Sequence, residues 1–187
     1  YLMKTLEESG LPAGVMNFIP GSGSLISNVV LNHKELTGIH FTGSNSTFNT
    51  LWKQVADNLS TYKSYPKIVG ETGGKDFIFA HRSANPPELA TAIVRGAFEY
   101  QGQKCSAASR AYIPESLWGE TKAHILRMIS EIKTGNVSDL GNFVNAVIDE
   151  PAFNRIMDYI GKAKSSGKAE IIAGGRGDKS KGYFVEP

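Results

Sequence analysis

Short apolar runs alternate with segments of helical periodicity along the whole chain, and this alternation is the strongest constraint on its fold. The clearest helical segment lies between two such runs, where apolar side chains recur at the spacing of one helix face: Phe48, Leu51, Trp52, Val55 and Leu59. A strand–helix–strand order with short connections predicts parallel strands covered by helices. The sequence therefore predicts an α/β fold.

The same patterns assign the other elements. Strands are predicted over residues 15–19, 38–41, 67–69, 76–80, 110–113, 170–173 and 183–187. Helices are predicted over residues 1–8, 24–31 and 86–100, and around the apolar positions of 125–132 and 153–160. The double glycine at 73–74 is the predicted boundary between two domains, residues 1–73 and 74–187.

Composition excludes several classes of protein. Of the 187 residues, 41% are hydrophobic, which is enough for a packed core. The 20 basic and 18 acidic residues leave a net charge of +2, so a basic surface for nucleic acid is not expected. No apolar run approaches the roughly 20 residues of a membrane helix. A single cysteine, Cys105, rules out an internal disulfide and a cysteine-rich zinc site, and no metal site is predicted.

The two ends of the sequence indicate an internal part of a longer protein. The chain begins at Tyr1 within a predicted helix, and it ends at Pro187 within a predicted strand. No signal or transit peptide is recognisable in it. We therefore expect any targeting segment to lie outside these residues.

Two loops of small residues follow predicted strands and precede predicted helices. They are Gly21-Ser22-Gly23 and Phe41-Thr42-Gly43-Ser44. Backbone N–H groups at such a place can hold a phosphate, and open α/β sheets bind ligands at the carboxyl ends of their strands. The first loop lacks the third glycine of a dinucleotide fingerprint, where Ile26 stands. A flexible turn in the first loop, and a helix cap at Ser44 or Ser46 in the second, explain both loops without a ligand.

Glu71 and Cys105 have the neighbours that best indicate chemistry. Glu71 lies in a glycine-rich loop, residues 70–75, where a carboxylate crowded by backbone and short of water can act as a base. Cys105 is flanked by Lys104 and Ser106, so we expect it to be partly exposed, and a neighbouring cation or N–H groups would favour the nucleophilic thiolate. The structural alternatives are a surface ion pair of Glu71 with the loop lysine and a buried, inert cysteine.

A cysteine–histidine hydrolase is a further possibility for Cys105. That chemistry needs a histidine close to the thiol in space. The chain has four candidates: His33, His40, His81 and His124. No spacing selects one of them, and structural roles are expected for all four.

Taken in order, the motifs resemble those of the aldehyde dehydrogenase superfamily. They are Phe41-Thr42-Gly43-Ser44, Glu71-Thr72-Gly73-Gly74-Lys75 and Gly102-Gln103-Lys104-Cys105. The resemblance implies an aldehyde dehydrogenase-like α/β fold: part of a Rossmann-like NAD-binding domain over residues 1–73, followed by part of an α/β catalytic domain over 74–187. Residues 81–84, 97–107 and 182–187 are similar to the pyrroline-carboxylate branch of that family. This branch oxidises L-glutamate γ-semialdehyde to L-glutamate in proline breakdown.

The resemblance implies a role for each matching residue. Cys105 would be the nucleophile that adds to the aldehyde, and Glu71 the base that activates water to hydrolyse the resulting thioester. Ser106 would bind the α-carboxylate of the substrate. The cofactor would be NAD, with its diphosphate side lined by Gly43, Ser44, Asn45, Ser46 and Thr47.

The resemblance also implies properties of the whole protein. It would act on a small-molecule aldehyde, assemble as a homo-oligomer of two or more copies, and bind neither membrane nor nucleic acid. It would reside in the mitochondrial matrix of a eukaryote, or otherwise in the cytoplasm, and would not be secreted. Other active-site groups of the family lie outside this chain, so the 187 residues alone are expected to show no turnover.

Two alternatives within the family stay open. The first is an aldehyde dehydrogenase of another specificity, because Ser106 is only one of several substrate contacts. The second is a catalytically silent member that serves as a binding or structural module; the presence of both Glu71 and Cys105 argues against it. One departure from the family pattern is Thr72, which stands where the family usually has leucine and would change packing beside the nicotinamide.

Overall fold

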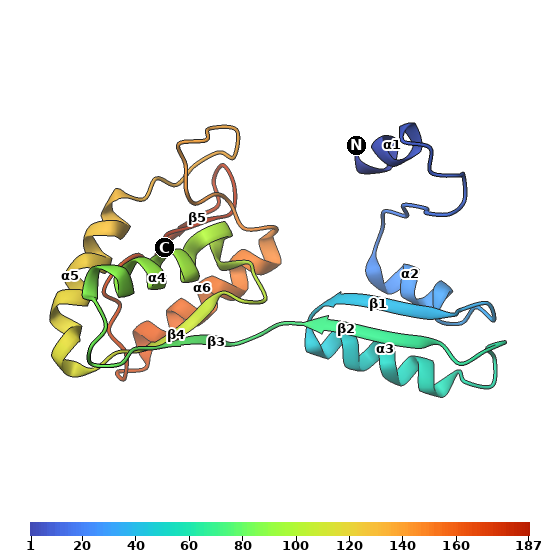
Figure 1. The fold of residues 1–187 in the computed structure, drawn as a ribbon, viewed down its shortest axis with the longest axis horizontal. Helices are drawn as coiled ribbons and strands as arrows, with labels where there is room; N and C mark the ends of the chain where they lie inside the picture. Colours follow the sequence, from blue (N-terminus) through green and yellow to red (C-terminus); the bar gives the residue numbers. More distant parts are fainter. The chain divides into compact units, whose positions relative to one another are not determined.

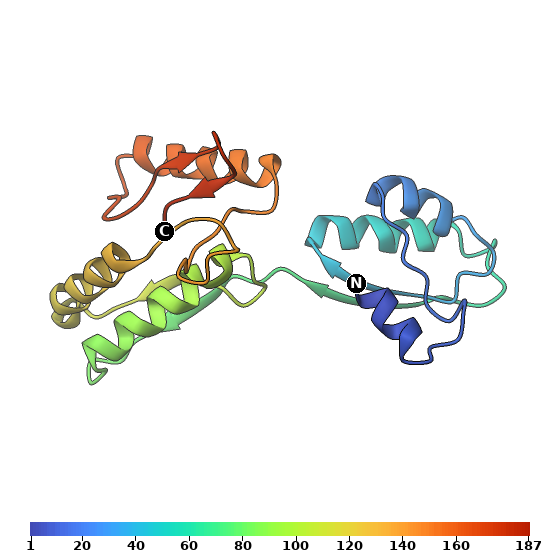
Figure 2. The same ribbon diagram turned by 90° about the horizontal axis from the view of Figure 1, so that it is seen from above.

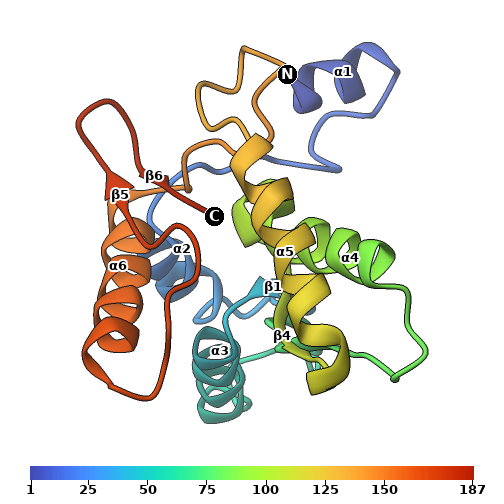
Figure 3. The ribbon, with the colours of Figure 1, turned by 90° about the vertical axis from the view of Figure 1, so that its left-hand side faces the viewer.

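The computed structural model describes residues 1–187, which form two compact units, Tyr1–Thr72 and Gly73–Pro187. Figure 1 labels most of the elements of both units along the ribbon, and Figure 3 also labels β6. Both units combine strands with covering helices, which confirms the predicted α/β class. None of the helices is long and apolar enough to cross a membrane.

The first unit is built around two parallel strands joined by a helical crossover. Its elements are α1 (Leu2–Glu8), α2 (Gly23–Val30), β1 (Gly38–Gly43), α3 (Asn45–Asp57) and β2 (Lys67–Thr72). The strands pair in register, with Ile39 opposite Ile68 and Thr42 opposite Glu71. Because a parallel pair cannot be joined by a tight hairpin, α3 connects the two strands and packs along them (Figure 1).

The core of the first unit forms between the apolar face of α3 and the strands. Its buried members are Leu31, Leu36, Leu51 and Val55, and Ile39, Phe41, Tyr62 and Ile68 pack against them. An aromatic cluster extends this contact, since the Phe48 ring stacks on Phe41 at 5.9 Å and meets Trp52 edge-on at 5.5 Å. Gly70 leaves room for this cluster, because a Cβ there would overlap the Phe48 ring.

The second unit carries a parallel strand pair, three long helices and a short hairpin. Its elements are β3 (Asp76–Phe79), α4 (Pro86–Phe98), the 3₁₀ turn η1 (Glu99–Gly102), β4 (Ala108–Tyr112), α5 (Glu115–Glu131), α6 (Glu150–Ser165), β5 (Gly177–Asp178) and β6 (Phe184–Val185). β3 and β4 are parallel, whereas β5 and β6 form an antiparallel hairpin. Figures 2 and 3 show α4 and α5 side by side, and their contact buries Ala90, Val94 and Ile125.

A further cluster of the second unit joins α6 to the chain around Val147 and to the β5–β6 hairpin. Val147, Ala152 and Phe153 are buried there, and Tyr183 and Val185 pack against them. The Val147 N–H donates to the Tyr183 carbonyl at 2.8 Å. The segment that precedes α6 is therefore fixed by both packing and backbone hydrogen bonds.

Two of the predicted strands are wrong. Residues 15–19 form no strand, and the Val15 N–H instead closes a turn onto Pro12. Residues 170–173 are also irregular, and the hairpin β5–β6 forms nearby in their place. An apolar run becomes a strand only where a neighbour accepts its hydrogen bonds, and neither run pairs with a strand of this chain.

One helix is shorter than predicted. The pattern predicts a helix to Tyr100, but α4 ends at Phe98 and the chain enters η1. The backbone leaves the helical conformation at Glu99, which has a ψ of 133°, and becomes left-handed at Tyr100, which has a φ of 55°. Tyr100 lies five residues before Cys105, so this change of direction shapes the site described below.

Candidate active site

The end of β1 and the start of α3 form a strand-to-helix junction lined by small residues. Ser44 is the N-cap of α3, and its Oγ accepts the Thr47 N–H at 3.2 Å. The same oxygen lies 2.8 Å from Oγ1 of Thr47 and 3.2 Å from Oγ of Ser46. The N–H groups of Asn45 and Ser46, at the first helical positions, have no acceptor within the helix. The junction therefore combines a capped helix with free donors that suit an anion.

Glu71 lies at the same edge of the first unit as this junction. It pairs with Thr42 in the β1–β2 ladder, and Thr72 pairs with Gly43. The carboxyl ends of both strands thus present Glu71 beside the residues that lead into α3. The Glu71 side chain is exposed, so the shielding from water predicted from its small neighbours is not found.

The other small-residue loop of the first unit also precedes a helix. Ser22 is the N-cap of α2, but its hydroxyl caps no backbone N–H and lies 2.8 Å from Oγ of Ser24. Gly21 and Gly23 are exposed. This loop therefore has the geometry of a simple turn, the structural interpretation that its sequence favoured.

Cys105 occupies a tight turn just before β4. The Ala107 N–H donates to the Lys104 carbonyl at 3.3 Å, which places Cys105 and Ser106 at the two central positions. Both side chains are exposed. The thiol is therefore accessible to a reactant, and the alternative of a buried, inert cysteine is wrong.

The turn follows three consecutive residues with left-handed backbone. Tyr100 and Gln101 have φ values of 55° and 56°, and Gly102 follows with 66°. Only glycine adopts this conformation freely, and for an L-residue with a side chain it costs roughly 1–2 kcal/mol. Tyr100 and Gln101 are the only non-glycine residues with positive φ in the chain, so the backbone strain is concentrated immediately before Cys105.

Gly74 lies directly against the backbone of this turn. A Cβ added to Gly74 would lie 2.6 Å from the Cys105 carbonyl oxygen and 2.6 Å from Oδ2 of Asp76. Real Cβ atoms do not approach other atoms this closely, and the first of these neighbours is backbone. Only glycine lets the two segments approach to this distance.

Substitution of Gly74 by alanine is expected to push the Cys105 turn away from β3. We expect a loss of about 1–3 kcal/mol in the free energy of unfolding, because the added methyl group overpacks the contact. We also expect an altered rate of alkylation of Cys105 by iodoacetamide. Gly73→Ala is the matched control, because a Cβ at Gly73 would meet no atom within 4 Å. Equal stability and equal alkylation rates in the two variants would show that the close approach has no consequence.

Lys104 forms an ion pair with Glu99. Its Nζ lies 3.1 Å from Oε2 of Glu99, and Arg95 lies 3.6 Å from the other oxygen. The hydrogen bond and charge of Lys104 lower the pKa of Glu99 below its ordinary value, with a smaller contribution from Arg95. The sequence nominated Lys104 as a neighbouring cation for Cys105, but the structure pairs it with a carboxylate.

Neither histidine of the second unit is hydrogen-bonded to the thiol. Nδ1 of His81 lies 2.9 Å from Oγ of Ser83, and Nε2 of His124 lies 3.8 Å from Glu120 on the same helix. Within this unit no Cys–His pair is formed, so the structure gives no support to the hydrolase alternative.

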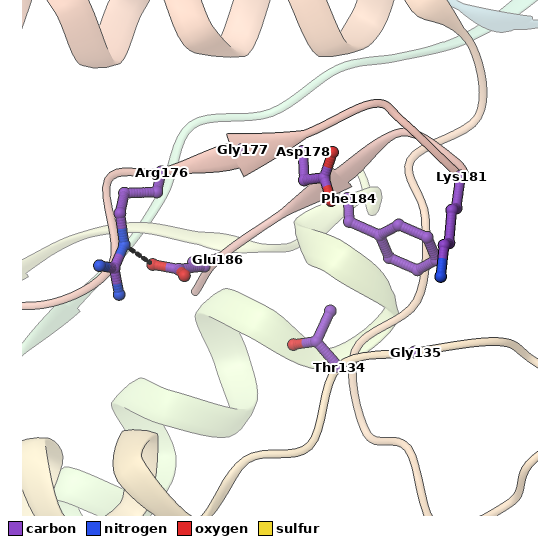
Figure 4. A pocket seen from close by; sticks show the side chains of 8 residues that line it. All are labelled: Thr134, Gly135, Arg176, Gly177, Asp178, Lys181, Phe184 and Glu186. Carbon is purple, nitrogen blue, oxygen red and sulfur yellow. Dashed lines mark hydrogen bonds and ion pairs between the residues drawn. The ribbon is translucent and has the colours of Figure 1, made fainter.

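The second unit also contains a pocket with several charged residues in its lining, beside the β5–β6 hairpin. It has a volume of about 680 Å³ and is lined by eight residues, shown in Figure 4: Thr134, Gly135, Arg176, Gly177, Asp178, Lys181, Phe184 and Glu186. Its two ends differ, because Arg176 is paired with Glu186 at 2.9 Å while Lys181 extends beside the Phe184 ring. None of the residues predicted for catalysis or cofactor binding lines this pocket.

Comparison with known proteins identifies the family. The profile of the aldehyde dehydrogenase family matches residues 1–187, the entire length described here. This chain belongs to the aldehyde dehydrogenase family. The resemblance of the three ordered motifs is thereby confirmed, as is the aldehyde dehydrogenase-like fold class.

Individual relatives of this aldehyde dehydrogenase chain share one name. The chain is 53% identical over 186 residues to the mitochondrial Delta-1-pyrroline-5-carboxylate dehydrogenase of Dictyostelium discoideum. That match covers 98% of this chain and 33% of that protein. It is 48% identical over 185 residues to the human protein of the same name, with the same coverage. The chain thus spans about a third of the length of the curated relatives it matches.

Solved structures agree with this similarity. The Delta-pyrroline-5-carboxylate dehydrogenase of Mycobacterium tuberculosis bound with NAD is 49% identical and has a TM-score of 0.95, covering 99% of this chain and 35% of that one. The 1-pyrroline-5-carboxylate dehydrogenase of Thermus with bound NAD is 26% identical, with a TM-score of 0.90, covering 100% and 36%. The fold of this aldehyde dehydrogenase chain is therefore that of known NAD-bound structures.

Proposed function

We propose that this chain is part of an NAD-dependent dehydrogenase that oxidises L-glutamate γ-semialdehyde, derived from Δ1-pyrroline-5-carboxylate, to L-glutamate in proline catabolism. The observation that carries the proposal is the place of Cys105. Its thiol is exposed between Lys104 and Ser106, in a tight turn that follows the strained backbone of residues 100–102. The names of the relatives support the choice of substrate.

The first chemical step in the proposal belongs to Cys105. Its thiolate adds to the aldehyde carbon, a C–S bond forms, and the carbonyl π electrons move to oxygen to give a thiohemiacetal. Covalent attachment matters because the tetrahedral oxyanion can expel a hydride, which the trigonal aldehyde cannot do readily. The backbone N–H of Cys105 supplies one donor to the oxyanion. When the hydride leaves, the C–O double bond re-forms and a thioester remains on Sγ.

The second step belongs to Glu71. Its carboxylate takes a proton from water, the hydroxide attacks the thioester carbon, and the C–S bond breaks to release glutamate and the thiolate. The exposure of Glu71 keeps its oxygens accessible to water. We propose Glu71 as this base because its strand ends at the same edge as the start of α3.

The residues at the β1–α3 junction fit the diphosphate of NAD. Gly43 has no side chain, so a phosphate can approach the backbone where β1 ends. The N–H groups of Asn45 and Ser46 are free to donate to phosphate oxygens. The hydroxyls of Ser44, Ser46 and Thr47 cluster around the same turn. When bound, NAD supplies the hydride acceptor. The two compact units would then be the C-terminal part of an NAD-binding domain and the N-terminal part of a catalytic domain, divided near residues 73–74.

Ser106 is proposed to bind the α-carboxylate of the substrate. It is exposed next to Cys105, and a hydroxyl in this place can donate to an anionic oxygen. Other aldehydes remain the alternative for the same machinery, because Ser106 is one contact among several. We propose a homo-oligomer for the full-length protein, and a mitochondrial location if its source is a eukaryote, as in the names of the relatives.

A substrate comparison tests the proposal. We expect the full-length protein to reduce NAD with glutamate γ-semialdehyde, at a kcat/KM at least about 10-fold above that for a straight-chain aldehyde of equal length without the α-carboxylate. In the same experiment, thiol alkylation mapped to Cys105 should be slowed by NAD and substrate together. Preference for the uncharged aldehyde would favour another specificity. An absence of both turnover and ligand protection would favour the catalytically silent alternative.

A further inference from the structure

We propose that Gln103 is a positioning residue for Cys105, acting with Gln101 to fix the left-handed turn that leads into the catalytic thiol. We call these two side chains the glutamine clamp. The inference rests on the proposed function of Cys105, and it concerns residues for which the sequence predicted no role. It explains how two residues with unfavourable backbone conformations are held in place.

The clamp consists of two side-chain oxygens that accept backbone N–H groups from one distant segment. Oε1 of Gln103 accepts the Ile148 N–H at 2.9 Å. Exchange of the terminal oxygen and nitrogen of the Gln101 amide places its oxygen 2.7 Å from the Asn145 nitrogen, where it accepts that N–H. The Gln103 N–H in turn donates to the Tyr100 carbonyl at 3.0 Å, across the left-handed residues.

The segment that holds the clamp is itself firmly anchored. Val144 and Val147 are buried, with exposed fractions of 2% and 5%. The Val144 carbonyl accepts the Gly135 N–H at 3.0 Å, and the Asn145 side chain donates to the Gly135 carbonyl at the same distance. Residues 144–148 are therefore held by packing and hydrogen bonds, and the two glutamines attach the turn to this segment.

The clamp controls position more than stability. Ile148 is 81% exposed, so water can replace Gln103 at the Ile148 N–H when the glutamine is removed. The strained residues 100–102 would then be free to relax toward ordinary backbone angles. Because Cys105 follows Gly102 by three residues, that relaxation would move the thiol away from the position in which it attacks.

Three variants of the full-length protein test this role. Gln103→Ala removes the acceptor, Gln103→Glu keeps an acceptor oxygen at the same reach, and Gln54→Ala on α3 is a matched control that removes an exposed amide far along the sequence. We expect Gln103→Ala to lower kcat about 10- to 100-fold with KM within about 3-fold of the parent value. We expect Gln103→Glu to recover most of the lost kcat, and all variants to unfold near the same temperature.

The outcomes separate this inference from the proposed function. A Gln103→Ala variant with unchanged kcat overturns the positioning role, as does a Gln103→Glu variant that is equally impaired. Impairment that merely follows a lower unfolding temperature overturns it as well, because it would be a structural effect. Replacement of Cys105 in parallel tests the proposed function itself. If turnover survives loss of the thiol, the proposed function is wrong, regardless of the result for the Gln103 variants.

Discussion

Replacement of Cys105 by serine in the full-length protein is expected to lower NAD-dependent oxidation of glutamate semialdehyde by at least about 10⁴-fold. The serine side chain has nearly the same size, so the turn of residues 104–107 is retained. A serine hydroxyl is not ionised near neutral pH, so it adds poorly to an aldehyde. Turnover should be measured from the formation of reduced NAD under saturating substrate.

The control for this variant is Ser109→Ala, which alters a small exposed side chain at the start of β4. We expect that variant to retain turnover, and both variants to bind NAD and unfold at the parent temperature. If the Cys105→Ser protein were to keep more than about a tenth of the parent rate, covalent catalysis by this thiol would have to be abandoned.

Much of the fold was predictable because its elements follow simple periodicities. The apolar spacing of α3 predicts the face that packs on the strands, and Leu51 and Val55 are buried there. Pro86 and Pro87 fix the beginning of α4, where the fixed φ of proline suits a first helical turn. These signals are local, so they can be read from a short stretch of sequence without knowing which residues lie next to it in space.

The wrong strands show where local signals fail. Residues 15–19 have an apolar run bounded by proline, yet a strand exists only when a neighbouring strand completes its ladder. The same holds for residues 170–173, whereas the two short strands β5 and β6 pair with each other. Pairing depends on the rest of the fold, and a single sequence does not contain that information in any short window.

The candidate site was predictable in its residues but not in its support. Exposure of Cys105 follows from its small and polar neighbours, and Ser44 as the cap of α3 follows from its place before the helix. The left-handed conformation of Tyr100 and Gln101 does not follow from their side chains, since neither residue favours it. The same is true of the approach of Gly74 to the Cys105 carbonyl. Both features depend on contacts between segments that are distant in the sequence.

Replacement of Glu71 by glutamine is expected to stop the reaction after one turnover. Loss of a general base slows proton removal from water by about 10²–10⁴-fold, whereas formation of the thioester needs no base from this residue in the proposed scheme. A rapid burst of reduced NAD, close to one per thiol, should therefore precede a slow steady rate. Mass spectrometry of the stalled protein should find the acyl group on the peptide that contains Cys105.

The control is Glu7→Gln on α1, an exposed carboxylate of the same unit, which should show the parent rate and no burst. The burst discriminates between roles of Glu71 that a rate alone would not separate. A fall in the steady rate without a burst would place Glu71 before the thioester, as an activator of the thiol. Unchanged kinetics would remove Glu71 from the mechanism and leave hydrolysis to a base outside this chain. Because the base and the nucleophile act in successive steps, only the Glu71→Gln variant should accumulate the acyl-enzyme, whereas Cys105→Ser should form none.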